Sequence, residues 1–118
     1  MDNPSKIVRE EKILIFFSPR QTTQFEGRSA AAGDWIIAEP HKAVYAGQKL
    51  TWKAVGNCQT LELDLPNVFP EPRRIKVTGN TVSATLTADA PEGVYAYEAY
   101  CNDQLAVGGS SPVLILDP

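Results

Sequence analysis

Turn-forming residues interrupt this sequence at short intervals, and this feature limits the fold more than any other. The 118-residue chain contains nine prolines and eight glycines, which recur roughly every eight to fifteen residues. The segments between them are short and rich in β-branched and aromatic residues, and helical patterns are almost absent. The spacing predicts a chain of short strands joined by turns.

The clearest strand is the segment "TLELDLP" at residues 60–66. Leu61, Leu63 and Leu65 alternate with Glu62 and Asp64. Successive side chains of a strand point to opposite faces, so this period of two predicts a sheet with one face in the core and one face in water.

The same criteria predict strands along the rest of the chain. They are expected at 12–18, 35–40, 42–45, 49–55, 73–77, 81–86, 93–101 and 111–118. Gly47 and the pair Gly79-Asn80 predict two hairpins. The polar segment 18–34 is expected to be a long connection with at most one helical turn near 29–33. We therefore expect a single all-β domain over residues 1–118, an antiparallel Greek-key β-sandwich.

Composition and charge exclude several classes of function. The net charge of −3 argues against a nucleic-acid surface, which needs an excess of clustered Lys and Arg. The longest apolar run, residues 13–17, is far shorter than the ~20 residues of a membrane-spanning helix. Residues 1–12 lack the apolar core of a signal peptide, so the protein is cytosolic or its export signal is not part of this sequence.

No catalytic cluster is evident. His41 is the only histidine, and no serine lies in a Gly-x-Ser-x-Gly elbow, so a nucleophile activated by a histidine base is not indicated. We expect no enzymatic activity. Tyr95 and Tyr100 are candidate ligand-binding residues, since aromatic rings stack on sugars and peptides.

Three stretches resemble the cupredoxin family, the blue-copper β-sandwiches. "AGQKLTWKAVGNCQTLEL" resembles the segment that carries the first copper-binding histidine, and Cys58 takes that histidine's place. "GVYAYEAYC" resembles the segment that delivers the copper thiolate, here Cys101 after Tyr100. "VLIL" resembles the final strand of the family. The resemblance spans roughly residues 36–116 and implies a cupredoxin-like sandwich.

The departures from the family pattern concern the copper ligands. A blue-copper centre uses two imidazoles, one thiolate and usually a weak axial thioether. The second histidine of the family falls at Gln104, a further candidate ligand-binding residue, and the axial methionine falls in the sulfur-free segment 106–112. The only methionine is Met1. The resemblance thus implies a degenerate member without copper and without another cofactor.

The resemblance also suggests a role for the second cysteine. In copper-bearing relatives the first histidine and the cysteine bind one metal ion, so their side-chain tips lie close together. A disulfide between Cys58 and Cys101 is therefore implied where relatives hold copper. Three alternatives stay open. The cysteines are two separate buried thiols, or they form a two-thiolate Cu(I) or Zn(II) site with Asp103 as the candidate third ligand. The third is an unorthodox copper site formed by Cys58, Cys101 and His41.

An immunoglobulin-like sandwich is the alternative fold, because it also bridges two strands by a disulfide. Its tryptophan follows the first cysteine and its tyrosine lies two residues before the second. Here Trp52 precedes Cys58, and Ala99 lies two residues before Cys101. Both landmarks of the immunoglobulin sandwich are missing.

These observations lead to one functional hypothesis and one alternative. The hypothesis is a non-enzymatic, copper-free, disulfide-stabilised domain that binds an unidentified protein or carbohydrate or has a structural role. We expect a monomer in the periplasm or outside the cell, since disulfides persist in oxidising compartments, or in the cytoplasm if the cysteines are free. The alternative is an unorthodox copper-binding or electron-transfer protein.

Overall fold

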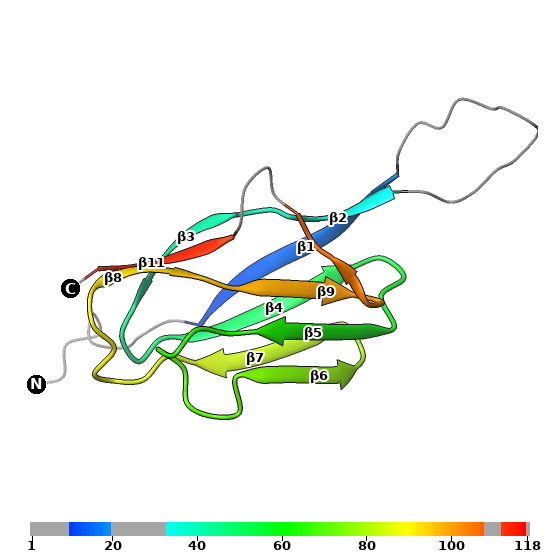
Figure 1. The fold of residues 1–118 in the computed structure, drawn as a ribbon. Coiled ribbons are helices and arrows are strands. Elements are labelled where there is room, and N and C mark those ends of the chain that lie inside the picture. Colours follow the sequence, from blue (N-terminus) through cyan, green and yellow to red (C-terminus); the bar gives the residue numbers. More distant parts are fainter. Residues whose placement is uncertain (1–9, 20–32, 108–111, 118) are drawn as a thin grey trace, which may run out of the picture.

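The computed structural model describes residues 10–19, 33–107 and 112–117, and every regular element in these ranges is a strand (Figure 1). The strands are β1 (Glu11–Pro19), β2 (Gly33–Ile37), β3 (His41–Tyr45), β4 (Lys49–Val55), β5 (Thr60–Asp64), β6 (Arg74–Thr78), β7 (Thr81–Thr85), β8 (Gly93–Ala96), β9 (Glu98–Cys101), β10 (Gln104–Leu105) and β11 (Val113–Asp117). Within these ranges no helix of a length and hydrophobicity suited to crossing a membrane is found.

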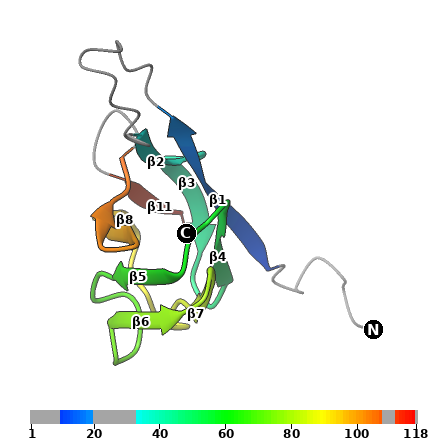
Figure 2. The ribbon, with the colours of Figure 1, turned by 90° about the vertical axis from the view of Figure 1, so that its right-hand side faces the viewer.

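The strands form three sheets arranged in two layers. One layer has the order β2-β1-β4-β7, and the opposite layer contains the orders β10-β9-β5-β6 and β3-β11-β8. The last two sheets are continuous through Tyr97, the single residue between β8 and β9. The two layers face each other in Figures 1 and 2, with β1, β4 and β7 behind β9, β5 and β6 in the first view.

Alternating side chains fill the space between the layers. Ile13 and Ile15 on β1 are fully buried, whereas Phe16 on the same strand is exposed. Leu61 and Leu63 on β5 are also fully buried, as their period of two predicts. The centre of the core is aromatic. Burial of these rows of apolar side chains stabilises the fold.

Trp52 lies at the centre of the aromatic group. Its ring centroid is 5.5 Å from that of Tyr97 and 6.2 Å from that of Phe69. All three side chains are almost completely buried. The edge-on arrangement of Trp52 and Tyr97 is one that aromatic pairs prefer, and it joins β4 in one layer to the β8–β9 junction in the other.

The predicted all-β sandwich is confirmed, and each segment expected to be a strand contains one. The expected strand 93–101 is divided into β8 and β9 at Tyr97, and β10 was not expected. Most ladders are antiparallel, but β1 pairs with β4 in parallel and β11 pairs with β3 in parallel. Neither parallel ladder was predicted. Parallel neighbouring strands are joined by long crossover connections, so local turn residues do not predict their pairing.

The two predicted hairpins are wrong. β3 pairs with β11, whereas β4 lies between β1 and β7, so the chain changes sheet after Gly47. β6 and β7 also lie in different sheets. At this second turn the Gly79 N–H donates to Gln59 O (2.8 Å), and Asn80 O accepts from the Ala54 N–H (2.8 Å). The turns therefore connect the two layers rather than neighbouring strands.

Most of the predicted connection at 18–34 lies outside the described residues, as does most of the small-residue loop at 107–112. The helical turn expected near 29–33 falls almost entirely in the undescribed part of the first segment. The strands on either side, β1 and β2, form an antiparallel pair from Ile15↔Ile37 to Pro19↔Gly33.

Candidate functional site

Cys101 ends β9 and is completely buried. After it the chain reverses through Asn102 and Asp103, with φ values of 53° and 65°, and Gln104 pairs back with Cys101. Asn and Asp tolerate the left-handed conformation better than other non-glycine residues, and two-residue hairpin turns require it. The sequence "CND" thus holds the Cys101 thiol beneath a tight turn.

Cys58 lies in the turn between β4 and β5 and is only 8% exposed. The turn begins at Gly56, whose φ of 119° lies in the region that favours glycine. The Cys58 N–H donates to Gly56 O at 3.0 Å, and the Cys58 thiol donates to Thr60 O at 3.2 Å. These two bonds fix the direction of the Cys58 side chain.

Asn102 joins the two turns. Its Oδ1 accepts from the backbone N–H groups of Gln59 (2.8 Å) and Thr60 (3.3 Å). Its Nδ2 donates to Asn57 O at 2.9 Å, and its own N–H donates to Thr60 O at 2.9 Å. Figure 1 shows the β4–β5 and β9–β10 connections side by side at one end of the sandwich. Asn102 therefore holds the Cys58 turn against the Cys101 turn.

The two cysteines lie 3.5 Å apart as free thiols. The expected meeting of these residues at one end of the sandwich is therefore present. The separation is longer than the ~2.05 Å of an S–S bond, so the disulfide remains a prediction. Burial, followed by the hydrogen bond with Cys58, raises the pKa of the Cys101 thiol well above its usual range, which keeps this sulfur protonated at neutral pH.

The side chains of Asp103 and Gln104 bind other partners, and His41 lies on a different strand. The Asp103 carboxylate faces the Lys76 ammonium at 3.0 Å. Gln104 donates from Nε2 to Gly33 O at 2.9 Å and so ties β10 to β2. His41 on β3 pairs with Val113, which pairs with Ala96.

Ala96 precedes Cys101 by five residues, roughly 16 Å along the strand at ~3.3 Å per residue. The structure does not bring His41 to the cysteine pair. Among the residues that the structure describes, no group of three or more His, Cys, Asp or Glu side chains could hold a metal ion.

The two candidate tyrosines do not share one surface. Tyr95 is packed against the core, and its hydroxyl donates to Pro91 O at 2.7 Å. Tyr100 is partly exposed; its hydroxyl donates to Glu98 Oε1 at 2.8 Å, and the Arg74 guanidinium lies 5.9 Å from its ring centroid. The hydrogen bond to Glu98 is the main cause that raises the pKa of Tyr100.

Known structures with similar folds are copper proteins. Copper nitrite reductase from Nitrosomonas europaea is 14% identical, with a TM-score of 0.56, over 95% of this chain and 42% of that chain. The chain has the cupredoxin fold. Fet3p, described as a multicopper oxidase that functions in iron import, is 12% identical, with a TM-score of 0.52, over 95% of this chain and 23% of that protein. The chain thus spans less than half of each of these proteins.

A purple cupredoxin from Nitrosopumilus maritimus is 15% identical over 91% of this chain and 99% of that chain, with a lower TM-score of 0.47. No family model matches the sequence, and no curated protein matches it. The cupredoxin fold agrees with the resemblance seen in the sequence, and the immunoglobulin-like alternative is set aside. At these identities the likeness establishes the fold alone.

Sequence reasoning missed Asn102, which organises the site. The available signal was the Asn-Asp pair directly after a strand, a composition typical of tight hairpin turns. The long-range bonds of its side chain to residues 57–60 depend on which two turns meet, and no local pattern specifies this.

Proposed function

We propose that this chain is a non-enzymatic, copper-free domain of cupredoxin fold in which a disulfide between Cys58 and Cys101 closes one end of the sandwich. The contact of these two buried residues at 3.5 Å is the observation that supports it. A movement of about 1.5 Å brings the sulfurs to bonding distance. The S–S bond forms as both thiols lose their protons and two electrons pass to an oxidising disulfide of a partner thiol oxidase.

The donor set supports the copper-free part of the proposal. A blue-copper ion takes two imidazoles and a thiolate, but the whole sequence contains one histidine. That histidine, His41, lies on β3, away from the cysteine pair. The residues present therefore do not fit a blue-copper ion, and we propose no electron transfer through copper in this domain.

The proposed location and role follow from the disulfide. Such bonds persist in oxidising compartments, which favours the periplasm or the extracellular space. Because the one histidine of the sequence lies on β3, away from both cysteines, the domain acts through its surface, as a binding or structural module. Its partner is a protein or a carbohydrate, and the domain itself is a monomer.

Copper addition tests the copper-free part. The oxidised protein mixed with one equivalent of Cu(II) should show no intense visible absorption band and no rise in melting temperature. A Cys101→Ser variant serves as the matched control, because it cannot supply the thiolate of a blue-copper site. An intense band in the wild type that is absent from this variant would refute the proposal.

The free-thiol form supports a second candidate, a site for Cu(I) at the cysteine pair. Two thiolates suit this soft ion, and both sulfurs are shielded from water. The raised pKa of Cys101 works against it, because the ion has to displace a tightly held proton. Reduced protein that retains one equivalent of Cu(I) on desalting, and loses it on Cys101→Ser, would establish this function. Retention in both proteins, or in neither, would exclude it.

A further inference from the structure

β8 has one edge that no described strand covers. Two leucine-rich segments lie inside the sheets instead. Residues 60–65 lie within β5 and its exit, between β9 and β6, and residues 113–116 lie within β11, between β3 and β8. Both are interior. β8 pairs with β11 on one side only, so its second edge is available to another chain.

The directions of the backbone hydrogen bonds show which N–H and C=O groups point to this edge. The Tyr97 N–H donates to Pro112 O at 3.1 Å, on the β11 side. Backbone groups alternate in direction along a strand, so the N–H and C=O groups of Val94 and Ala96 point to the opposite edge. Farther along the chain, in β9, this same edge is covered by β5, where Glu98 pairs with Asp64.

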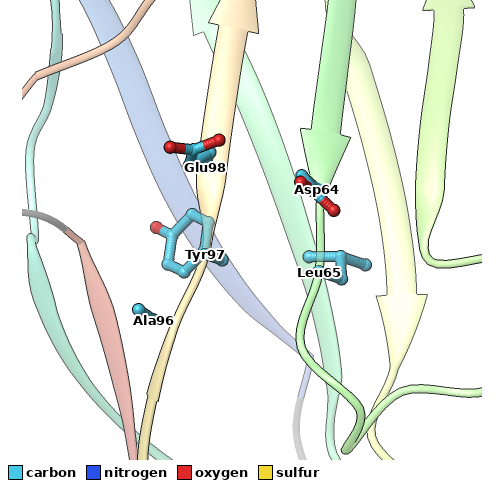
Figure 3. A pocket seen from close by; sticks show the side chains of 5 residues that line it. All are labelled: Asp64, Leu65, Ala96, Tyr97 and Glu98. Atoms are coloured by element: carbon cyan, nitrogen blue, oxygen red, sulfur yellow. The ribbon is translucent and has the colours of Figure 1, made fainter.

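The ladder between β5 and β9 ends at the pair Asp64 and Glu98. The Leu65 N–H donates to Arg73 O at 2.9 Å, and Pro66 has no N–H to offer. A pocket of about 290 Å³ lies at the divergence, lined by Asp64, Leu65, Ala96, Tyr97 and Glu98. Figure 3 shows the two backbones side by side at Leu65 and Tyr97 and diverging below them.

The outer rim of this pocket is acidic. Asp64 and Glu98 are direct cross-strand partners, and both carboxylates lie beside the divergence in Figure 3. Arg74 Nη1 lies 3.6 Å from Asp64, and Glu98 accepts from Tyr100. Arg74 is shared between Asp64 and Glu62, to which its Nε lies closer at 2.6 Å. The small Ala96 side chain leaves room for a long side chain from a neighbouring strand.

We propose that this edge binds an extended segment of a partner protein, which adds as a strand in line with β5 and antiparallel to β8. Its backbone bonds to Val94 and Ala96. A Lys or Arg opposite Ala96 reaches the carboxylates of Asp64 and Glu98, since diagonal neighbours on a sheet face lie within reach of long side chains. An apolar residue opposite the exposed Val94 follows two positions later, which gives the pattern Lys/Arg-x-Val/Ile. This proposal rests on the proposed role as a binding module.

The direct test uses the acetylated, amidated pentapeptide Thr-Lys-Thr-Val-Thr and its Thr-Glu-Thr-Val-Thr counterpart. The lysine peptide should bind with a dissociation constant below about 1 mM and slow the hydrogen exchange of the Val94 and Ala96 amides at least tenfold. The glutamate peptide should bind at least tenfold more weakly. Absence of binding by the lysine peptide, or binding without protection of these two amides, overturns the proposal.

Two variants distinguish the contribution of the backbone hydrogen bonds to peptide binding from that of the carboxylates. Ala96→Pro removes an edge N–H where proline is tolerated and should weaken binding at least tenfold. Asp64→Asn with Glu98→Gln should weaken it roughly threefold to tenfold, and Asp103→Asn, at the far end of β9, should leave it unchanged. Equal weakening by Asp103→Asn, or none by the double variant, contradicts the charge assignment. If Ala96→Pro lowers the melting temperature strongly, amide protection in the wild type decides the question.

Different results would refute strand addition at β8 and the proposed disulfide. Free thiols in the purified protein would remove the disulfide and leave peptide binding at β8 intact. Loss of peptide binding in a protein with an intact S–S bond would remove the strand-addition site alone.

Discussion

At the scale of single residues, the end of the sandwich depends on one asparagine. Asn102 satisfies two backbone N–H groups and one carbonyl of the neighbouring turn while holding a φ of 53°. Asn suits both tasks, because its short amide side chain donates and accepts and tolerates the left-handed conformation. The contact between Cys58 and Cys101 is a consequence of this arrangement.

Replacing Asn102 should therefore loosen the cysteine pair. Asn102→Gly keeps the backbone conformation and removes the side chain, and we expect it to lower the free energy of unfolding by about 1–2 kcal/mol. In reduced protein, Cys58 should also react faster with a thiol-alkylating reagent. Urea unfolding and alkylation rates measure the two effects. An unchanged alkylation rate would show that Asn102 does not hold the Cys58 turn.

Within the described residues the buried Tyr97 hydroxyl lacks a hydrogen bond of good geometry, although the neighbouring Trp52 side chain acts to lower its pKa. Burial raises the pKa of Tyr97 to about 12, so folding favours the protonated phenol. Tyr97→Phe removes an unpaired polar group and should change stability by less than about 1 kcal/mol at neutral pH. A loss above about 2 kcal/mol would instead indicate a hydrogen bond to the hydroxyl.

The raised pKa also predicts a pH dependence. The stability due to protonated Tyr97 is complete below the ordinary tyrosine pKa of about 10 and is lost as pH rises through the folded value of about 12. The unfolding free energy of the wild type should therefore fall more steeply than that of Tyr97→Phe between these pH values. Parallel curves in urea titrations across this range would contradict the assignment.

At the scale of strands, the sequence predicts positions better than partners. The alternation of Leu61 and Leu63 is local, so it could be recognised without the fold. The pairing of β3 with β11 and of β1 with β4 depends on the whole chain. Gly47 and Gly79 indicate where the chain turns, but the same turn composition suits a hairpin and a connection between layers. The uncovered edge of β8 could not be predicted from the sequence either, since it depends on where β5 ends.

Truncating a buried and an exposed strand residue should lower the free energy of unfolding by very different amounts. Leu63→Ala on β5 removes a fully buried side chain and should destabilise the protein by about 2–5 kcal/mol. Val94→Ala on β8, which is 66% exposed, should change stability by less than about 0.5 kcal/mol. Urea unfolding of both variants tests this contrast. A similar cost for the two would mean that β8 is covered in solution.

At the scale of the whole molecule, the S–S bond would link two turns that are far apart in sequence. It would close a loop of about 44 residues, which corresponds to roughly 4 kcal/mol in the chain-entropy model. The cysteine positions came from the resemblance to cupredoxins, and the fold brings them together. Neither residue spacing nor composition alone could have paired them, because two cysteines can equally be separate buried thiols.

We propose that Cys58 and Cys101 form a disulfide at the end of a cupredoxin fold. The most direct measurement is the intact mass of protein purified without reductant from an oxidising compartment, before and after denaturation with an alkylating reagent. We predict a mass lower by two hydrogen atoms than that of the reduced chain, and no alkyl groups added until a reductant is supplied. Two alkyl groups added without reductant would contradict the claim.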